Sequence, residues 1–184
     1  MNAAIATMVA LNIFHPSIII NQGTAGAYVS NLDTYDIVIG ESCVNINDLA
    51  MPTKSKGNGS NPLEWEFSKR SIYQYADKVL VALFKDATYL NHKKHIGTLG
   101  SGDLFSREVD RITWIQTCKG NLCEDIESIS VYEVCNRFSV PCIGIRIISN
   151  NEITLQPYDD KTPQLLQQFI VNTIKNFNYS DKCI

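Results

Sequence analysis

The sequence predicts an α/β fold, a single domain of three layers in which helices cover both faces of a mixed, mostly parallel central sheet. Two observations carry this prediction. Short β-branched runs alternate with segments of helical periodicity, which is typical of parallel strands joined by crossover helices. The run at 140–149 is almost continuously apolar, as expected of a strand buried on both faces. With about 150 residues per domain as a guide, residues 1–184 are expected to form one domain.

The N-terminal half is expected to contain a helix and two strands. Its alanine-rich start predicts a buried helix over 2–14, and the β-branched run SIIIN predicts a strand over 17–21. The small residues GTAG at 23–26 then predict a loop. A second strand is expected over 35–43, and the glycine, proline and asparagine content of 44–62 predicts a long surface loop.

The C-terminal half is expected to contain more helix. Apolar residues at helical spacing predict an amphipathic helix over 67–87, and a strand over 95–99 leads into GSGD at 100–103. Two further helices are predicted over 107–117 and 128–138, ahead of the apolar strand. Thr162 is expected to cap a final helix that runs to Phe177, with Pro163 at its first position.

Composition and charge exclude several classes of protein. The 16 basic and 19 acidic residues give a net charge of -3, which argues against nucleic-acid binding, because such binding depends on neutralised phosphates. No apolar run approaches the roughly 20 residues of a membrane span, and the first residues lack the basic region of a signal peptide. The 6 cysteines are therefore expected to be reduced, in a cytoplasmic protein. Cys118 and Cys123 lack the spacing of a zinc pair, so neither a metal nor a cofactor is expected.

Polar or glycine-rich residues follow each predicted strand. GTAG follows the first, SCVNIN the second, GSGD the third and SNN the last. Ligands of parallel sheets bind at the carboxyl ends of the strands. The sequence therefore predicts one binding cleft at this edge of the sheet.

Each polar residue in this cleft has a structural alternative. GTAG is either a tight turn or a place where the backbone comes close to a ligand. Asp103 either caps the next helix or faces the cleft. Glu127 either compensates a helix dipole or accepts two hydrogen bonds from a diol. Arg146 lies inside an apolar strand and needs a buried partner, which a structural salt bridge would supply.

Six stretches of sequence, taken together, resemble the purine nucleoside phosphorylase and nucleosidase superfamily, and in particular the 5'-methylthioadenosine/S-adenosylhomocysteine nucleosidases. They occur in the family's order: NAAIAT (2–7), IINQGTAGA (19–27), DIVIGES (36–42), GSGDLF (100–105), EDIES (124–128) and VPCIGIRIISN (140–150). The resemblance implies a phosphorylase/nucleosidase-like fold and hydrolysis of the N-glycosidic bond of a purine nucleoside. It also implies a homodimer, in which the loop at 44–65 would lie near the partner.

The resemblance assigns a role to each candidate site residue. Thr24 would lie near the ribose and the attacking water, and Glu127 would bind the ribose 2'- and 3'-hydroxyls. Phe105 would stack on the purine, with the backbone of Ser106 at the edge of the base. The remaining assignments are an apolar wall at Ile126, support of the site by Arg146, and contact with the base edge near N7 by Asp103 or Asn150.

Two departures from the family leave the activity open. Asn150 stands where the family has the aspartate that protonates purine N7, and an amide can donate a hydrogen bond there but cannot supply a proton. The sequence also begins inside a family segment, so we expect the fold to lack its first strands and the glutamate that activates water. Three functions stay open: a purine nucleosidase, a purine nucleoside phosphorylase, and a catalytically impaired nucleoside-binding remnant of the fold.

Overall fold

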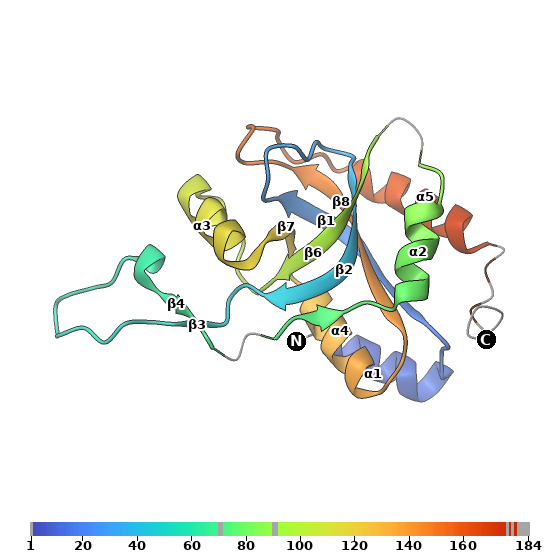
Figure 1. The fold of residues 1–184 in the computed structure, drawn as a ribbon, viewed down its shortest axis with the longest axis horizontal. Helices are drawn as coiled ribbons and strands as arrows, with labels where there is room; N and C mark the ends of the chain where they lie inside the picture. Colours follow the sequence, from blue (N-terminus) through green and yellow to red (C-terminus); the bar gives the residue numbers. More distant parts are fainter. Residues whose placement is uncertain (1, 70–71, 90–91, 176, 178, 180–184) are drawn as a thin grey trace.

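The computed structural model describes residues 2–69, 72–89, 92–175, 177 and 179. Its centre is a six-stranded sheet in the order β5-β2-β6-β7-β1-β8, in which β2 also pairs with β8. Five of the strands therefore close into a ring (Figure 1). The strands are β1 (Ile19–Ala27), β2 (Ile37–Asn45), β5 (Gln74–Tyr75), β6 (Lys94–Ser101), β7 (Asn121–Asp125) and β8 (Cys142–Asn150).

The ring is mixed, as the sequence predicts. β1 runs parallel to β8, and β6 runs parallel to both β2 and β7. The pairings β1–β7, β2–β8 and β2–β5 are antiparallel. The predicted α/β class with a mixed central sheet is confirmed.

Helices cover the sheet on two sides. α2 (Lys78–Asp86) and α5 (Thr162–Ile174) pack on one side against the isoleucines of β2 and β8. α1 (Asn2–Phe14) and α4 (Ser128–Arg137) lie together on another side, and α3 (Val109–Lys119) lies beside β7 (Figure 1). None of these helices is long and apolar enough to cross a membrane, and no group of three metal-ligating side chains occurs among the described residues.

Two predictions about strands are wrong. GTAG is not a loop: β1 continues through it, because residues 19–26 pair with 142–150 of β8 along the whole strand. β7 was not predicted, because its sequence NLCED has too few β-branched residues to be recognised, and burial in the ring forms the strand instead.

The predicted helix over 67–87 is wrong in its first half. That region contains β4 (Glu66–Phe67) and β5, and α2 begins only at Lys78. The Asp77 carboxylate accepts the backbone N–H groups of Val79 and Leu80, at 2.9 and 3.1 Å, and so fixes the start of the helix. At the final helix, Lys161 rather than Thr162 is the N-cap residue, and the helix ends at Ile174.

The predicted surface loop forms an arm that projects from the body of the molecule (Figure 1). It contains β3 (Leu49–Ala50), which pairs with β4, and a 3-10 turn at Pro62–Glu64. The described cysteines are all free, and Cys183 lies outside the described residues.

The ring closes where two glycines meet. Gly40 of β2 and Gly144 of β8 are registered partners, and a Cβ on either would lie within 3 Å of the Leu99 side chain. The buried hydroxyl of Tyr132 donates to the Gly40 carbonyl at 2.6 Å and accepts the Gly144 N–H at 2.7 Å. Helix α4 is thereby bonded to both strands of the closure.

Tyr132→Phe is expected to lower the free energy of unfolding by about 1–3 kcal/mol, because two buried backbone groups lose their partner. Chemical denaturation followed by circular dichroism measures this change. Tyr75→Phe, at an exposed tyrosine, is the matched control and should change stability little. Equal stabilities of the two variants would show that the hydroxyl does not hold the closure together.

Candidate functional site

A cavity of about 660 Å³ lies at the carboxyl ends of β1, β7 and β8, the edge of the sheet where the sequence predicts a cleft. Its walls include six of the candidate residues, which come from four separate parts of the chain. They are Thr24, Phe105, Ser106, Ile126, Glu127 and Asn150. The expected convergence is present in part: the first and last predicted strand ends line the cavity, whereas residues 42–47 and 100–103 do not.

The parallel register of β1 and β8 brings two candidate residues to the same edge of the cavity. Thr24 pairs with Ile147, and Gly26, two residues further on, pairs with Asn150. The Asn150 amide is held from both ends: its oxygen accepts the Ser149 hydroxyl at 3.1 Å, and its nitrogen donates to Glu152 at 3.4 Å. An amide has two N–H groups, so one remains for a ligand.

Arg146 lies beneath the cavity and is fully buried. Its Nε donates to the Asp125 carboxylate at 2.8 Å, and its Nη2 donates to the Ser128 hydroxyl at 2.8 Å and to the Asn21 side chain. Burial by itself would raise the Asp125 pKa, but the Arg146 charge and the bonds from Ser128 and Ser101 outweigh it and lower that pKa. The structural salt bridge expected for Arg146 is present.

This ion pair also orients Glu127. Asp125 Oδ1 accepts the backbone N–H groups of Glu127 and Ser128, at 3.0 and 2.8 Å, and so fixes the entry into α4. The Glu127 carboxylate lies 4.0 Å from Arg146 Nη2 and is 44% exposed, at the cavity. Glu127 has no side-chain capping bond to α4, so its carboxylate is available to a ligand.

The two candidate residues of the GSGDLF segment, Asp103 and Phe105, differ in their position relative to the cavity. Phe105 lines the cavity and is 66% exposed. Asp103 is exposed and is not among the residues that line the cavity. The capping alternative for Asp103 is wrong as well, because the N-cap residue of α3 is Glu108.

Glu124 is a cavity residue that was not predicted from the sequence. It is 5% exposed, accepts the Tyr28 hydroxyl at 2.9 Å and accepts the Ser106 backbone N–H at 3.0 and 3.2 Å. Burial raises the Glu124 pKa to about 7, against the opposing effect of those two donors. Consecutive residues of a strand point to opposite faces, so Glu124 and Asp125 cannot both face Arg146. This adjacent acidic pair was the feature of the sequence that could have identified Glu124.

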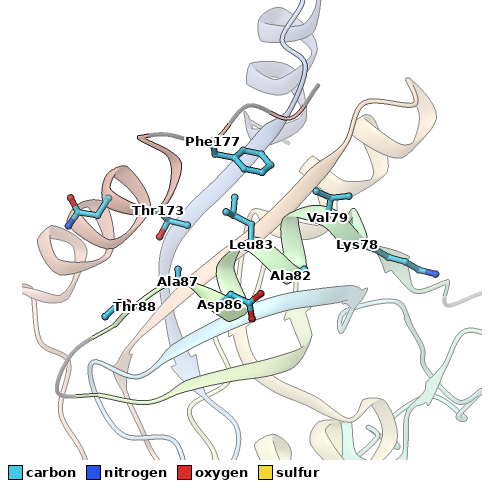
Figure 2. A pocket seen from close by; sticks show the side chains of 10 residues that line it. Lys78, Val79, Ala82, Leu83, Asp86, Ala87, Thr88, Thr173 and Phe177 are labelled. Atoms are coloured by element: carbon cyan, nitrogen blue, oxygen red, sulfur yellow. The ribbon is translucent and has the colours of Figure 1, made fainter. Parts of the chain in front are cut away.

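A second hollow, of about 800 Å³, lies between α2 and α5 (Figure 2). Half of its lining side chains are apolar, among them Leu83 and Phe177, and the other half are polar or charged, among them Lys78 and Asp86. None of the candidate site residues lines it. The candidate residues that line a cavity are therefore those at the strand ends.

The fold and this site define a class of protein. A family model of the phosphorylase superfamily matches residues 1–176, and the chain belongs to that superfamily.

Within it, the chain is similar to 5'-methylthioadenosine/S-adenosylhomocysteine nucleosidases. That of Oceanobacillus iheyensis is 30% identical over 184 residues, which cover 95% of this chain and 76% of the relative. That of Bacillus licheniformis is 26% identical and covers 97% and 78%.

Solved structures share the fold. The S-adenosylhomocysteine nucleosidase from Streptococcus pyogenes in complex with 5-methylthiotubericidin has a TM-score of 0.76 and 22% identity, over 96% of this chain and 75% of that one. An aspartate-to-asparagine mutant of the Helicobacter pylori nucleosidase, with 5'-methylthioadenosine in its active site, has a TM-score of 0.77 and 22% identity, over 95% and 75%.

Asp125→Asn is expected to lower the free energy of unfolding by about 3–5 kcal/mol, because it removes the buried carboxylate bonded to Arg146 and leaves only the half-exposed Glu127, 4.0 Å away, to balance that charge. Asp103→Asn, at an exposed aspartate, is the control and should have little effect. Because the folded Asp125 pKa is lowered, the stabilisation is complete above the ordinary aspartate pKa of 3.8 and is lost as pH falls through the folded value. Denaturation at pH 7 and at acidic pH checks both points, and a pH-independent difference between wild type and variant would contradict the linkage.

Proposed function

We propose that the protein hydrolyses the N-glycosidic bond of purine nucleosides and releases the free base. The observation that carries this proposal is the gathering of Thr24, Phe105, Glu127 and Asn150 around one cavity of about 660 Å³. These residues offer a stacking surface, a carboxylate and two polar side chains, which suit a base, a ribose diol and the reacting bond. The similarity to methylthioadenosine/S-adenosylhomocysteine nucleosidases supports hydrolysis over phosphorolysis.

The proposed mechanism is cleavage through a ribosyl cation. Glu127 would accept hydrogen bonds from the ribose 2'- and 3'-hydroxyls, and its negative charge would stabilise the positive charge that develops on the sugar. Arg146 and Asp125 do not contact the substrate in this scheme and hold Glu127 in position. Thr24 would orient the attacking water from the adjacent strand.

In this scheme residue 150 supplies no acid to protonate the leaving base. An acid that protonates the base contributes about 10²- to 10⁴-fold, and Asn150 has no proton to transfer. Its free N–H would instead donate a hydrogen bond to N7, or to an oxygen at C6, as negative charge builds up on the base. We therefore expect turnover that is slower than an aspartate would allow.

A homodimer and a cytoplasmic location are further parts of the proposal. The arm formed by β3 and β4 extends away from the body of the molecule and exposes Met51 and Leu63, which supports a contact with a second subunit (Figure 1). Light scattering after gel filtration tests this, and a monomer at all concentrations would contradict it. Fractionation of cells tests the location.

The activity is tested by chromatography of free base released from methylthioadenosine, S-adenosylhomocysteine, adenosine and inosine, with and without phosphate. Release without phosphate is expected, and Glu127→Gln should lower kcat/KM about 10²-fold because it removes the charge beside the developing cation. Glu133→Gln, at an exposed carboxylate of α4, is the control. Strict dependence on phosphate would identify a phosphorylase, and no release by folded protein would refute the enzyme.

Asn150→Asp is expected to raise kcat for adenine nucleosides by about 10-fold or more, because it supplies the missing acid. The proton-donating side chain would replace an amide of nearly the same shape, so the KM should change less than kcat. Steady-state kinetics with methylthioadenosine measure both. An unchanged kcat would mean that protonation of the base by residue 150 does not limit the reaction.

A further inference from the structure

Arg111 of α3 is a buried cation whose hydrogen bonds the protein leaves incomplete. It is 8% exposed, and its Nε is buried without a hydrogen-bond partner among the residues that the structure describes. The guanidinium lies 5.9 Å from the centre of the Trp114 ring. Its charge lowers the pKa of Glu124, but the Glu124 carboxylate takes its hydrogen bonds from other groups. Because buried charges are normally paired and hydrogen-bonded, Arg111 has donors to spare for a ligand.

Arg111 lines a third hollow, of about 430 Å³, between the first turn of α3 and the 3-10 turn of the arm. The described residues that line it are all different from those that line the cavity at the strand ends. The first N–H groups of a helix have no partner inside the helix, and Glu108, the N-cap residue of α3, makes no side-chain bond to them. Backbone donors and a guanidinium therefore meet at this hollow, an arrangement that suits a carboxylate.

Two acidic side chains restrict the kind of anion that fits. Glu108 and Asp110 are exposed and line the hollow together with Arg111. They would repel a simple anion such as phosphate. An ammonium group beside the bound carboxylate would instead be attracted by both of them. The charges around the hollow therefore match a zwitterion better than an anion.

The remaining wall of the hollow is largely apolar. Pro62, Leu63 and Val109 line it, and the last two are 37% and 44% exposed. Covering such surface with hydrocarbon is favourable.

We propose that this hollow binds an α-amino acid with an apolar side chain, at a site separate from the proposed active site. The carboxylate of the amino acid binds Arg111 and the N–H groups at the start of α3. Its ammonium group faces Glu108 and Asp110, and its side chain contacts Leu63 and Val109.

Calorimetry with leucine and two of its analogues tests the match of charges on the unaltered protein. Leucine should bind with a dissociation constant on the order of 1 mM, as expected for a small ligand in an open site. Isopentylamine lacks the carboxylate and should bind about 10-fold more weakly or worse. 4-Methylpentanoate lacks the ammonium group and should bind about 5-fold more weakly. Equal affinity for leucine and isopentylamine would overturn the inference.

Two arginine variants locate the site. Arg111→Gln should weaken the binding of leucine about 10- to 100-fold, the range expected for hydrogen bonds to a charged group. Arg107→Gln is the matched control, at an exposed arginine that lines the strand-end cavity and pairs with Glu152. It should leave the affinity for leucine unchanged. Weakening by Arg107→Gln but not by Arg111→Gln would place the amino acid in the strand-end cavity and overturn the inference.

The fluorescence of Trp114 gives a second readout of position. The chain has 2 tryptophans, so Trp65→Phe leaves Trp114 as the only one. Because Arg111 lies over the Trp114 ring, leucine should change this emission with the dissociation constant that calorimetry gives. Binding of leucine without a change in Trp114 emission would overturn the inference. So would the absence of binding at about ten times the expected dissociation constant.

Discussion

The buried ion pair of Arg146 and Asp125 is the constraint on which the rest of the site depends. Taking two charges out of water costs several kcal/mol per ion, and only good geometry with further hydrogen bonds offsets that cost. Here those bonds come from Asn21 of β1, Ser101 of β6 and Ser128 of α4. Because these bonds offset the cost of burial, β1, β6 and α4 must meet β7 and β8, which carry the pair, in one arrangement, and the cavity lies above it.

One short strand then distributes three carboxylates among different tasks. Asp125 points to the buried arginine, Glu124 points to the opposite face, and Glu127 lies just beyond the strand where α4 begins. Their environments differ accordingly: the neighbouring cation lowers the pKa of Asp125, and burial raises that of Glu124 to about 7. A strand of such polar sequence is stable only because its neighbours in the ring supply the burial and the partners.

That dependence on neighbours explains what could be predicted from sequence. The strand β8 was recognised because a continuous apolar run by itself predicts burial on both faces. The polar residues that follow the predicted strands led to the cavity. The strand β7 and the burial of Glu124 were missed, since the strand follows from its pairing with β1 and β6, and the burial from contacts with Tyr28 and Ser106, which come from other parts of the chain. The helix over 67–87 was overextended because apolar spacing says nothing of Asp77, whose capping bonds start the helix later.

On the proposed chemistry, the sugar and the base are stabilised by residues of different elements. Glu127, where α4 begins, would act on the positive charge that develops on the ribose, and Asn150 of β8 would face the departing base. A bond from Asn150 to N7 or to an oxygen at C6 strengthens as negative charge develops on the base, and only a bond that strengthens in this way accelerates the chemical step. Loss of the acid at residue 150 therefore leaves the stabilisation of the sugar intact, because that depends on Glu127 and on the buried ion pair that positions it.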